Sequence, residues 1–212
     1  HAGRKASTYA PWRGSGEVPR AKGGWQAVAP SALAFDDGYP LPLALDAEGI
    51  AKVVADYRAA ALRAHAAGFR IVEIHAAHGY LLHEFLSPLS NRREDAYGGS
   101  FDGRARLLRE AVVAVREVWP EELPLWLRIS ATDWVDGGWD VEQSIELARI
   151  VGPLGVDLVD VSSGGLDPRQ KIAAGPGYQV PFAARIRREA GVATGAVGLI
   201  TEPAQAEAIV AG

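Results

Sequence analysis

The chain contains neither cysteine nor methionine. Without cysteine it can form no disulfide and no thiolate metal site. A strong charge of either sign is also lacking, because 22 Lys and Arg residues stand against 26 Asp and Glu residues, for a net charge of −4. That balance gives no electrostatic basis for nucleic-acid binding. The apolar runs are far shorter than a membrane span. We therefore expect a cytoplasmic protein that binds neither nucleic acid nor membrane.

The lack of methionine also bears on completeness. A natural translation product starts with Met, whereas this sequence starts with His1. A processed end, or a protein rich in glycine and alanine and poor in methionine, would explain the same observation. We favour an internal piece of a longer protein, and the topology predicted below agrees with that interpretation.

The composition is that of a soluble globular domain, with 48% hydrophobic and 23% charged residues. The length suits one large domain with a sizeable core, so we assign residues 1–212 to a single domain. Residues 1–45 carry scattered glycine, proline and tryptophan without a sustained period, and they predict a lid or loop region. Residues 46–212 predict α/β repeats.

A helix followed by a short apolar strand recurs along residues 46–212. Asp46 and Asp140 are typical N-cap residues, and Gly68 and Gly191 are typical of helix ends. The apolar periodicity predicts helices over 50–67, 101–119, 141–154, 180–189 and 201–210, and strands over 69–74, 125–130, 156–162 and 193–197.

Regular alternation of helix and strand predicts parallel strands with right-handed crossovers. A doubly wound nucleotide-binding sheet would carry G-x-G-x-x-G in its first βα turn, and no such motif follows any predicted strand. Polar residues instead follow every strand, as expected where eight loops share one pocket at the top of a (β/α)8 TIM barrel. We therefore predict an α/β fold of the barrel type. It is incomplete in this chain, because four predicted strands cannot close a barrel.

One stretch concentrates titratable groups at a strand end. Residues 71–100 read IVEIHAAHGYLLHEFLSPLSNRREDAYGGS, so His75, His78 and Tyr80 follow a β-branched run within six residues. Polar groups at the carboxyl end of a core strand are typical of an α/β active site. The His-x-x-His pair could polarise a substrate oxygen, bind a metal or be structural, although no third metal ligand accompanies it. His83, at a helix start, is expected to be structural.

Other candidates lie at the ends of later strands. Arg128 closes LWLRIS, where a charge needs a partner; an ion pair with a carboxylate at the barrel top, such as Asp133, and a cofactor contact both remain open. Gly195 and Gly198 precede a predicted helix, whose N-terminus and backbone N–H groups could hold a phosphate, although glycines there are also simple turn formers. Four further residues could form pocket walls or simply pack: Lys5, Trp12, Trp25 and Tyr178.

At HAAHGYLLHEFLSPLSNRREDAYGGS the chain resembles the old yellow enzyme family of FMN-dependent ene-reductases. The opening HAGRKA, at 1–6, is similar to the segment after that family's third strand, and TGAVGLIT, at 194–201, to its seventh strand and phosphate turn. PGYQVPFA, at 176–183, resembles the bacterial branch that includes the xenobiotic reductases. The resemblance covers essentially the whole chain, and the family's strands one, two and eight are expected to be missing.

The resemblance implies an NADPH dehydrogenase that takes hydride from NADPH or NADH and passes it from reduced FMN N5 to activated alkenes such as α,β-unsaturated carbonyls, and also to nitro compounds. It implies that His75 and His78 bind the substrate oxygen, that Tyr80 donates the proton, and that Tyr178 lies near the substrate. It further implies a homodimer or homotetramer for the whole protein. The implied cofactor-binding residues are Arg128, at the flavin N1/O2 edge, and Gly195, Val197 and Gly198, at the phosphate.

Two alternatives remain. One is a metal-dependent barrel hydrolase that uses His75 and His78. The other is that this polypeptide, taken alone, is a non-catalytic fragment, because an incomplete barrel exposes strand edges.

Overall fold

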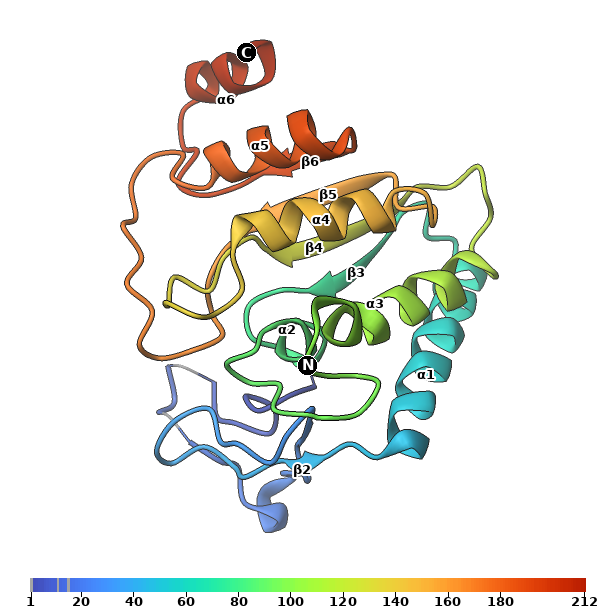
Figure 1. Cartoon of the computed structure of the whole chain (residues 1–212), viewed down its shortest axis with the longest axis vertical. Helices are drawn as coiled ribbons and strands as arrows, with labels where there is room; N and C mark the ends of the chain where they lie inside the picture. The colour runs from blue at the N-terminus through green and yellow to red at the C-terminus, as the bar shows by residue number, and fades with distance from the viewer. Residues whose placement is uncertain (1, 11, 15) are drawn as a thin grey trace.

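The computed structural model describes residues 2–10, 12–14 and 16–212, and it centres on a parallel four-stranded sheet (Figure 1). The strands are β3 (Val72–Ala76), β4 (Leu125–Ser130), β5 (Leu158–Ser162) and β6 (Ala193–Ala196), in the order β3-β4-β5-β6. The helices are α1 (Ala47–Ala66), α2 (Leu81–Leu86), α3 (Phe101–Arg116), α4 (Val141–Val151), α5 (Val180–Ala190) and α6 (Pro203–Ala211). Strand order follows chain order without reversal, as in a barrel and unlike a doubly wound sheet.

The predicted elements are present, with differences at some boundaries. β3 starts at Val72, not at residue 69, because Val72 is the first residue to pair with β4 while Phe69 and Ile71 are exposed. β5 starts at Leu158, since Asp157 turns its carboxyl oxygen to the N–H of Leu125. The last helix was predicted from residue 201 and begins at Pro203, a residue favoured at a helix start.

Two predicted N-caps are confirmed by hydrogen bonds. Asp46 Oδ1 accepts the Gly49 N–H at 2.8 Å ahead of α1, and Asp140 Oδ1 accepts the Gln143 N–H at 2.9 Å ahead of α4. Each satisfies a backbone donor that the helix itself leaves unpaired. At the far end of α5, Gly191 adopts the left-handed conformation (φ 72°) that was expected of a helix-ending glycine.

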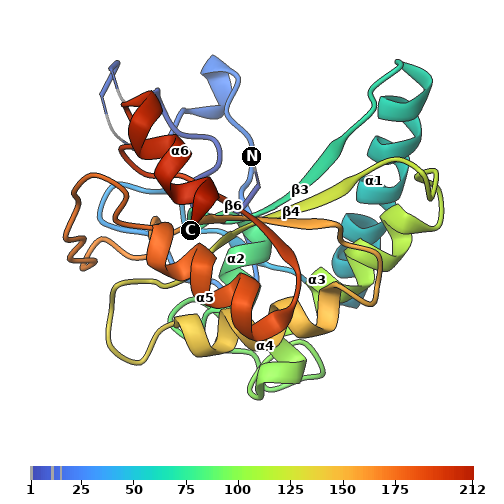
Figure 2. The same cartoon turned by 90° about the horizontal axis from the view of Figure 1, so that it is seen from above.

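The two faces of the sheet differ in chemistry. Figure 2 shows α3, α4 and α5 along one side of it. Ile74, Leu127 and Val159 are buried among the residues of that core, together with the large Trp119 and Phe85. Because side chains alternate along a strand, the neighbouring positions face the other way, and these carry His75, Arg128 and Asp160. The polar face of the sheet therefore belongs to the site and the apolar face to the core.

Over residues 2–10, 12–14 and 16–45, the regular elements are a short parallel pair, β1 (Val28–Ala29) with β2 (Leu43–Ala44), and a 3-10 turn, η1 (Arg20–Lys22). The first residues of this region are tied to α2. The Ala2 carbonyl accepts the Leu81 N–H at 3.0 Å, and the Arg4 N–H is donated to Glu84 Oε1 at 2.7 Å. In the described part of the chain, no helix is both long enough and apolar enough to cross a membrane.

Candidate active site

A polar row crosses the sheet near the carboxyl ends of its strands. His75 on β3 is paired in register with Arg128 on β4, Arg128 with Asp160 on β5, and Asp160 with Gly195 on β6. Ser130 and Ser162 form the next pair on the same face, one step closer to the strand ends. Parallel pairing thus brings together residues that are 120 positions apart in the chain.

His75, His78 and Tyr80, at the carboxyl end of β3, lie together. The ring centroids of His75 and His78 are 5.2 Å apart, and those of His75 and Tyr80 are 5.7 Å apart. His78 takes the left-handed conformation (φ 58°), which is uncommon for a residue with a side chain and reverses the chain after the strand. Gly79 follows with φ 69°, where a Cβ would lie 2.1 Å from the Gly165 carbonyl oxygen. The turn therefore requires glycine for close approach to the loop after β5.

Both the backbone and the ring of His78 are anchored by strand-end serines. Its N–H is donated to Ser130 Oγ at 2.9 Å, and its Nε2 lies 2.8 Å from Ser162 Oγ. Burial, reinforced by His75 and the positive charge of Arg128, lowers the pKa of His78 to about 4. Burial and Arg128 likewise lower the pKa of His75. Both imidazoles are therefore neutral at physiological pH.

Lys5 connects this turn to the loop after β5. Its ammonium group donates to the carbonyls of His78 and Gly165, both at 2.6 Å, and lies 5.0 Å from the ring centroids of Phe35 and Tyr80. Burial lowers its pKa to about 8, against the opposing effect of Glu84. The sequence did not decide whether Lys5 forms a pocket wall or only packs. In the structure it contacts the turn over His78, Gly79 and Tyr80, which we call the active turn. Trp12 and Trp25 are largely exposed.

Arg128 has a different partner from the one considered in the sequence. Its Nε lies 3.3 Å from Asp160 Oδ2 on the neighbouring strand, with about a third of its side chain accessible. The ion pair with a carboxylate that the sequence suggested is therefore present, but its partner is Asp160 and not Asp133. Asp133 is fully buried and lies 2.8 Å from His83 Nε2.

His83 and Asp133 form a buried pair behind the active turn. His83 Nδ1 accepts the Gly79 N–H at 2.9 Å, so its ring proton is on Nε2 and is donated to Asp133 Oδ1. The other carboxyl oxygen of Asp133 accepts from Ser87 Oγ at 2.6 Å and from the Trp139 N–H at 2.7 Å. This arrangement agrees with the structural role expected of His83, and it fixes the backbone between His78 and Tyr80.

The glycine turn after β6 is crowded from one side. Gly198 has φ 114°, and a Cβ there would lie 2.9 Å from both Gln179 Nε2 and the Tyr178 ring. Gln179 Nε2 donates to the Val197 carbonyl at 3.2 Å. A Cβ on Gly195 would make only ordinary contacts. Tyr178, predicted near the substrate, therefore lies beside the turn predicted to bind the cofactor phosphate.

Gln179 was not found from the sequence. It is 2% exposed, and its Oε1 accepts from Ser163 Oγ at 2.6 Å, so it joins the end of β5 to the end of β6. One glutamine ahead of a helix carries no pattern that marks this bridge, because its partners are distant in the chain.

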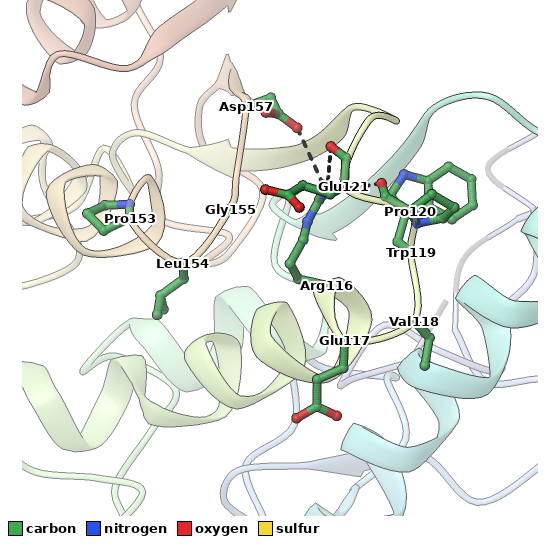
Figure 3. Close-up of a pocket in the computed structure, with 10 residues that line it drawn as sticks. All are labelled: Arg116, Glu117, Val118, Trp119, Pro120, Glu121, Pro153, Leu154, Gly155 and Asp157. Carbon is green, nitrogen blue, oxygen red and sulfur yellow. Dashed lines mark hydrogen bonds and ion pairs between the residues drawn. The ribbon is translucent and has the colours of Figure 1, made fainter.

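A separate hollow lies at the opposite ends of the strands (Figure 3). Arg116 points into it, donates to the carbonyls of Pro120 and Leu123, and lies 3.4 Å from Asp157 Oδ2. These bonds join the end of α3 to the starts of β4 and β5. In a barrel, that end contributes stability and the other end carries chemistry. We therefore place the functional site at the His75 end.

Within residues 2–10, 12–14 and 16–212, no group of three or more His, Asp or Glu side chains is arranged to hold a metal ion. His1, part of the HAGRKA resemblance, lies outside the described residues.

Comparison with known proteins identifies the chain at the level of family. The model of the NADH:flavin oxidoreductase / NADH oxidase family matches residues 1–212. The chain belongs to this family. Among curated members, the NADPH dehydrogenases of Listeria monocytogenes and Bacillus subtilis are 50% and 47% identical over 209 residues. That span is 99% of this chain and 56% of each relative, so the chain covers about half the length of the enzymes it matches.

Solved structures place this flavin oxidoreductase chain in the predicted fold. The old yellow enzyme homologue from Zymomonas mobilis matches all of the chain and 58% of its own length, with a TM-score of 0.75 and 27% identity. A 2-naphthoyl-CoA reductase complex matches 89% of the chain and 30% of its own length, with a TM-score of 0.82 and 27% identity. The sheet of strands β3, β4, β5 and β6 is thus part of an incomplete (β/α)8 barrel. The resemblance drawn from the sequence is confirmed.

Proposed function

We propose that the intact protein is an FMN-dependent NAD(P)H oxidoreductase that reduces activated alkenes, with α,β-unsaturated carbonyls as the main class and nitro compounds as further substrates. The observation that carries this proposal is the grouping of His75, His78 and Tyr80 at one end of a polar sheet face that also presents Arg128. Relatives named NADPH dehydrogenase, at about half identity, support the same reaction class.

In this proposal His75 and His78 bind the substrate oxygen. Burial lowers the pKa of each, so both are neutral and donate through ring N–H groups. Neutral donors aimed at an oxygen stabilise the negative charge that develops on it as the double bond is reduced, and they need no reorganisation during the reaction. The anchoring of His78 by Ser130 and Ser162 holds one donor in place.

Tyr80 is the proton donor to the substrate α-carbon. It is the N-cap residue of α2, and its ring centroid lies 5.7 Å from that of His75 and 5.0 Å from the Lys5 ammonium nitrogen. A phenol held at the start of a helix can act as a general acid and transfer its proton to the substrate α-carbon. Tyr178 is proposed as a further wall of the substrate pocket.

The residues present fit a flavin mononucleotide. Arg128 places a cation on the polar face beside His75, as an anionic reduced flavin ring at its N1/O2 edge would require. The turn over Gly195, Val197 and Gly198 is proposed to hold the phosphate through backbone N–H groups, and the positive φ of Gly198 gives this turn a conformation that favours glycine. When bound and reduced by NADPH or NADH, FMN supplies the hydride.

The test uses the purified intact protein. It should be yellow with a flavin spectrum, and it should oxidise NADPH when cyclohexenone is added. His75→Ala and His78→Ala should each raise the KM for cyclohexenone while the flavin spectrum is retained. A colourless protein that FMN cannot reconstitute contradicts the proposal.

Metal analysis of the same sample addresses the hydrolase alternative, which would be supported by stoichiometric zinc without flavin. Flavin titration of the 212-residue chain by itself decides whether that piece is competent alone. The proposed homodimer or homotetramer is tested by size-exclusion chromatography with light scattering on the intact protein.

A further inference from the structure

The neutral ring of His78 carries one proton, and the nitrogen that bears it decides what the ring can do. Ser162 engages Nε2 at 2.8 Å, so Nδ1 is the ring nitrogen left to meet a substrate. If Nδ1 carries the proton, it donates to an oxygen. If Nε2 carries it, Nδ1 presents a lone pair, which repels the oxygen of a carbonyl or phenolate.

The hydroxyl proton of Ser162 has two acceptors near it. Gln179 Oε1 is 3.4 Å away, beyond the usual range for an O–H···O bond, and it already accepts a bond of 2.6 Å from Ser163. His78 Nε2 is within ordinary range. Ser162 is only 6% exposed, so solvent offers this proton little alternative. Donation from Ser162 Oγ–H to His78 Nε2 is therefore the arrangement in which the buried hydroxyl has a good acceptor.

We propose that Ser162 is a positioning residue that donates its hydroxyl proton to His78 Nε2 and thereby keeps the ring proton on Nδ1, facing the substrate oxygen. This inference rests on the proposed role of His78 in binding that oxygen.

The electrostatic surroundings make the choice of nitrogen consequential. Arg128 and Lys5, together with the rings of His75 and His83, all oppose a second proton on His78, in addition to the effect of burial. A ring whose pKa is about 4 does not become doubly protonated at neutral pH, so it cannot donate from both nitrogens at once. At neutral pH the Nε2–H tautomer therefore has no proton on Nδ1 to donate to a substrate oxygen.

Nitrogen-15 NMR of the histidine-labelled intact protein reads the tautomer directly. The chain has five histidines, and a His78→Asn sample assigns the His78 signals by their loss. The wild-type protein should show a protonated Nδ1 and an unprotonated, hydrogen-bonded Nε2. A protonated Nε2 overturns the proposal, whether or not the protein binds FMN and reduces alkenes.

Variants then test whether Ser162 is the cause. Ser162→Ala should shift the His78 signals towards a mixture of tautomers and raise the KM for cyclohexenone by the reciprocal of the remaining Nδ1–H fraction, about twofold for an even mixture. Ser162→Thr, which retains the hydroxyl, should restore the wild-type signals. Ser31→Ala is the control, since the Ser31 hydroxyl accepts the Arg92 N–H in another part of the chain and its loss should leave the His78 tautomer unchanged. Wild-type His78 signals in Ser162→Ala overturn the assignment.

The outcome is separable from that of the proposed function. A protein that lacks flavin and alkene reductase activity but shows the Nδ1–H tautomer contradicts the function and keeps the tautomer assignment. A yellow, active enzyme with the Nε2–H tautomer supports the proposed function and contradicts the tautomer assignment.

Discussion

Burial decides the protonation of the residues around the active turn. His75 and His78 are held neutral, and the pKa of Lys5 falls to about 8, because each is withdrawn from water beside positive charge or apolar surface. In the proposed function, neutral imidazoles can hold a substrate oxygen through hydrogen bonds alone. Residue-scale predictions therefore concern hydrogen bonds and protons.

Replacing Tyr80 with phenylalanine removes the phenolic proton and retains the ring that contacts His75 and Lys5. We expect the rate of alkene reduction to fall about a hundredfold or more, as for loss of a general acid. Stopped-flow measurement of the two half-reactions checks this. Flavin reduction by NADPH should change little, and an equal loss in both half-reactions would contradict the role of Tyr80.

Replacing His83 with leucine leaves the buried Asp133 without one of its donors and the Gly79 N–H without its acceptor. We expect a loss of about 3–5 kcal/mol in the free energy of unfolding, the usual cost of removing one partner of a buried polar pair. Urea denaturation measures it. His65→Leu is the control, because His65 is exposed and its replacement should cost about 0.5 kcal/mol or less.

At the scale of elements, the site depends on where loops meet. The turn after β3 packs on the loop after β5 through Gly79 and Gly165, and the turn after β6 packs on the start of α5 through Gly198. Glycine is required where these backbones approach, since a Cβ on Gly79 would lie 2.1 Å from a carbonyl oxygen. The loops therefore act as one unit.

Gly198→Ala tests that unit on its proposed cofactor side. Alanine at this position would have to keep a strained positive φ, and its Cβ would lie too close to Gln179 and Tyr178. The turn must therefore shift. We expect FMN to bind at least about tenfold more weakly, by fluorescence titration of the apoprotein. Gly175→Ala, in the preceding loop, meets nothing within 4 Å and should bind FMN as the wild type does. Equal FMN affinities of the two variants would contradict the proposal that this turn binds the FMN phosphate.

At the scale of the whole molecule, the segment ahead of β1 is joined to the barrel through a buried pair. Glu84 on α2 is fully buried, accepts the Arg4 N–H at 2.7 Å and lies 3.8 Å from its guanidinium Nε. Burial raises the pKa of Glu84 to about 8, and Arg4 only partly offsets this. The carboxyl is therefore largely protonated in the folded protein at neutral pH.

This shift links stability to pH. Between about 4.5 and about 8 the folded state holds a proton that the unfolded state releases, so the contribution of Glu84 is full below 4.5 and declines as pH rises to about 8. Glu84→Gln cannot titrate. We expect the stability difference between wild type and variant to change by on the order of 5 kcal/mol over that window, with the wild type becoming relatively less stable at higher pH. Urea denaturation of both proteins across the window measures it. A difference that is constant with pH would show that Glu84 does not titrate there.

The sequence by itself determined the alternation of helices and strands, the caps at Asp46 and Asp140, and the placement of His75, His78 and Tyr80 at the carboxyl end of β3. These depend on neighbours in the chain: periodicity, N-caps and strand ends are local signals. A family motif could also be read directly from residues 71–100, because it is contiguous.

Only the tertiary structure decided the partners. Arg128 pairs with Asp160 and not Asp133, and Ser162, Gln179 and Lys5 bond across strands that are far apart in sequence. The burial that neutralises the histidines and Glu84 is likewise set by packing. A strand pattern gives each side chain its face of the sheet, but the register between strands selects which side chains meet.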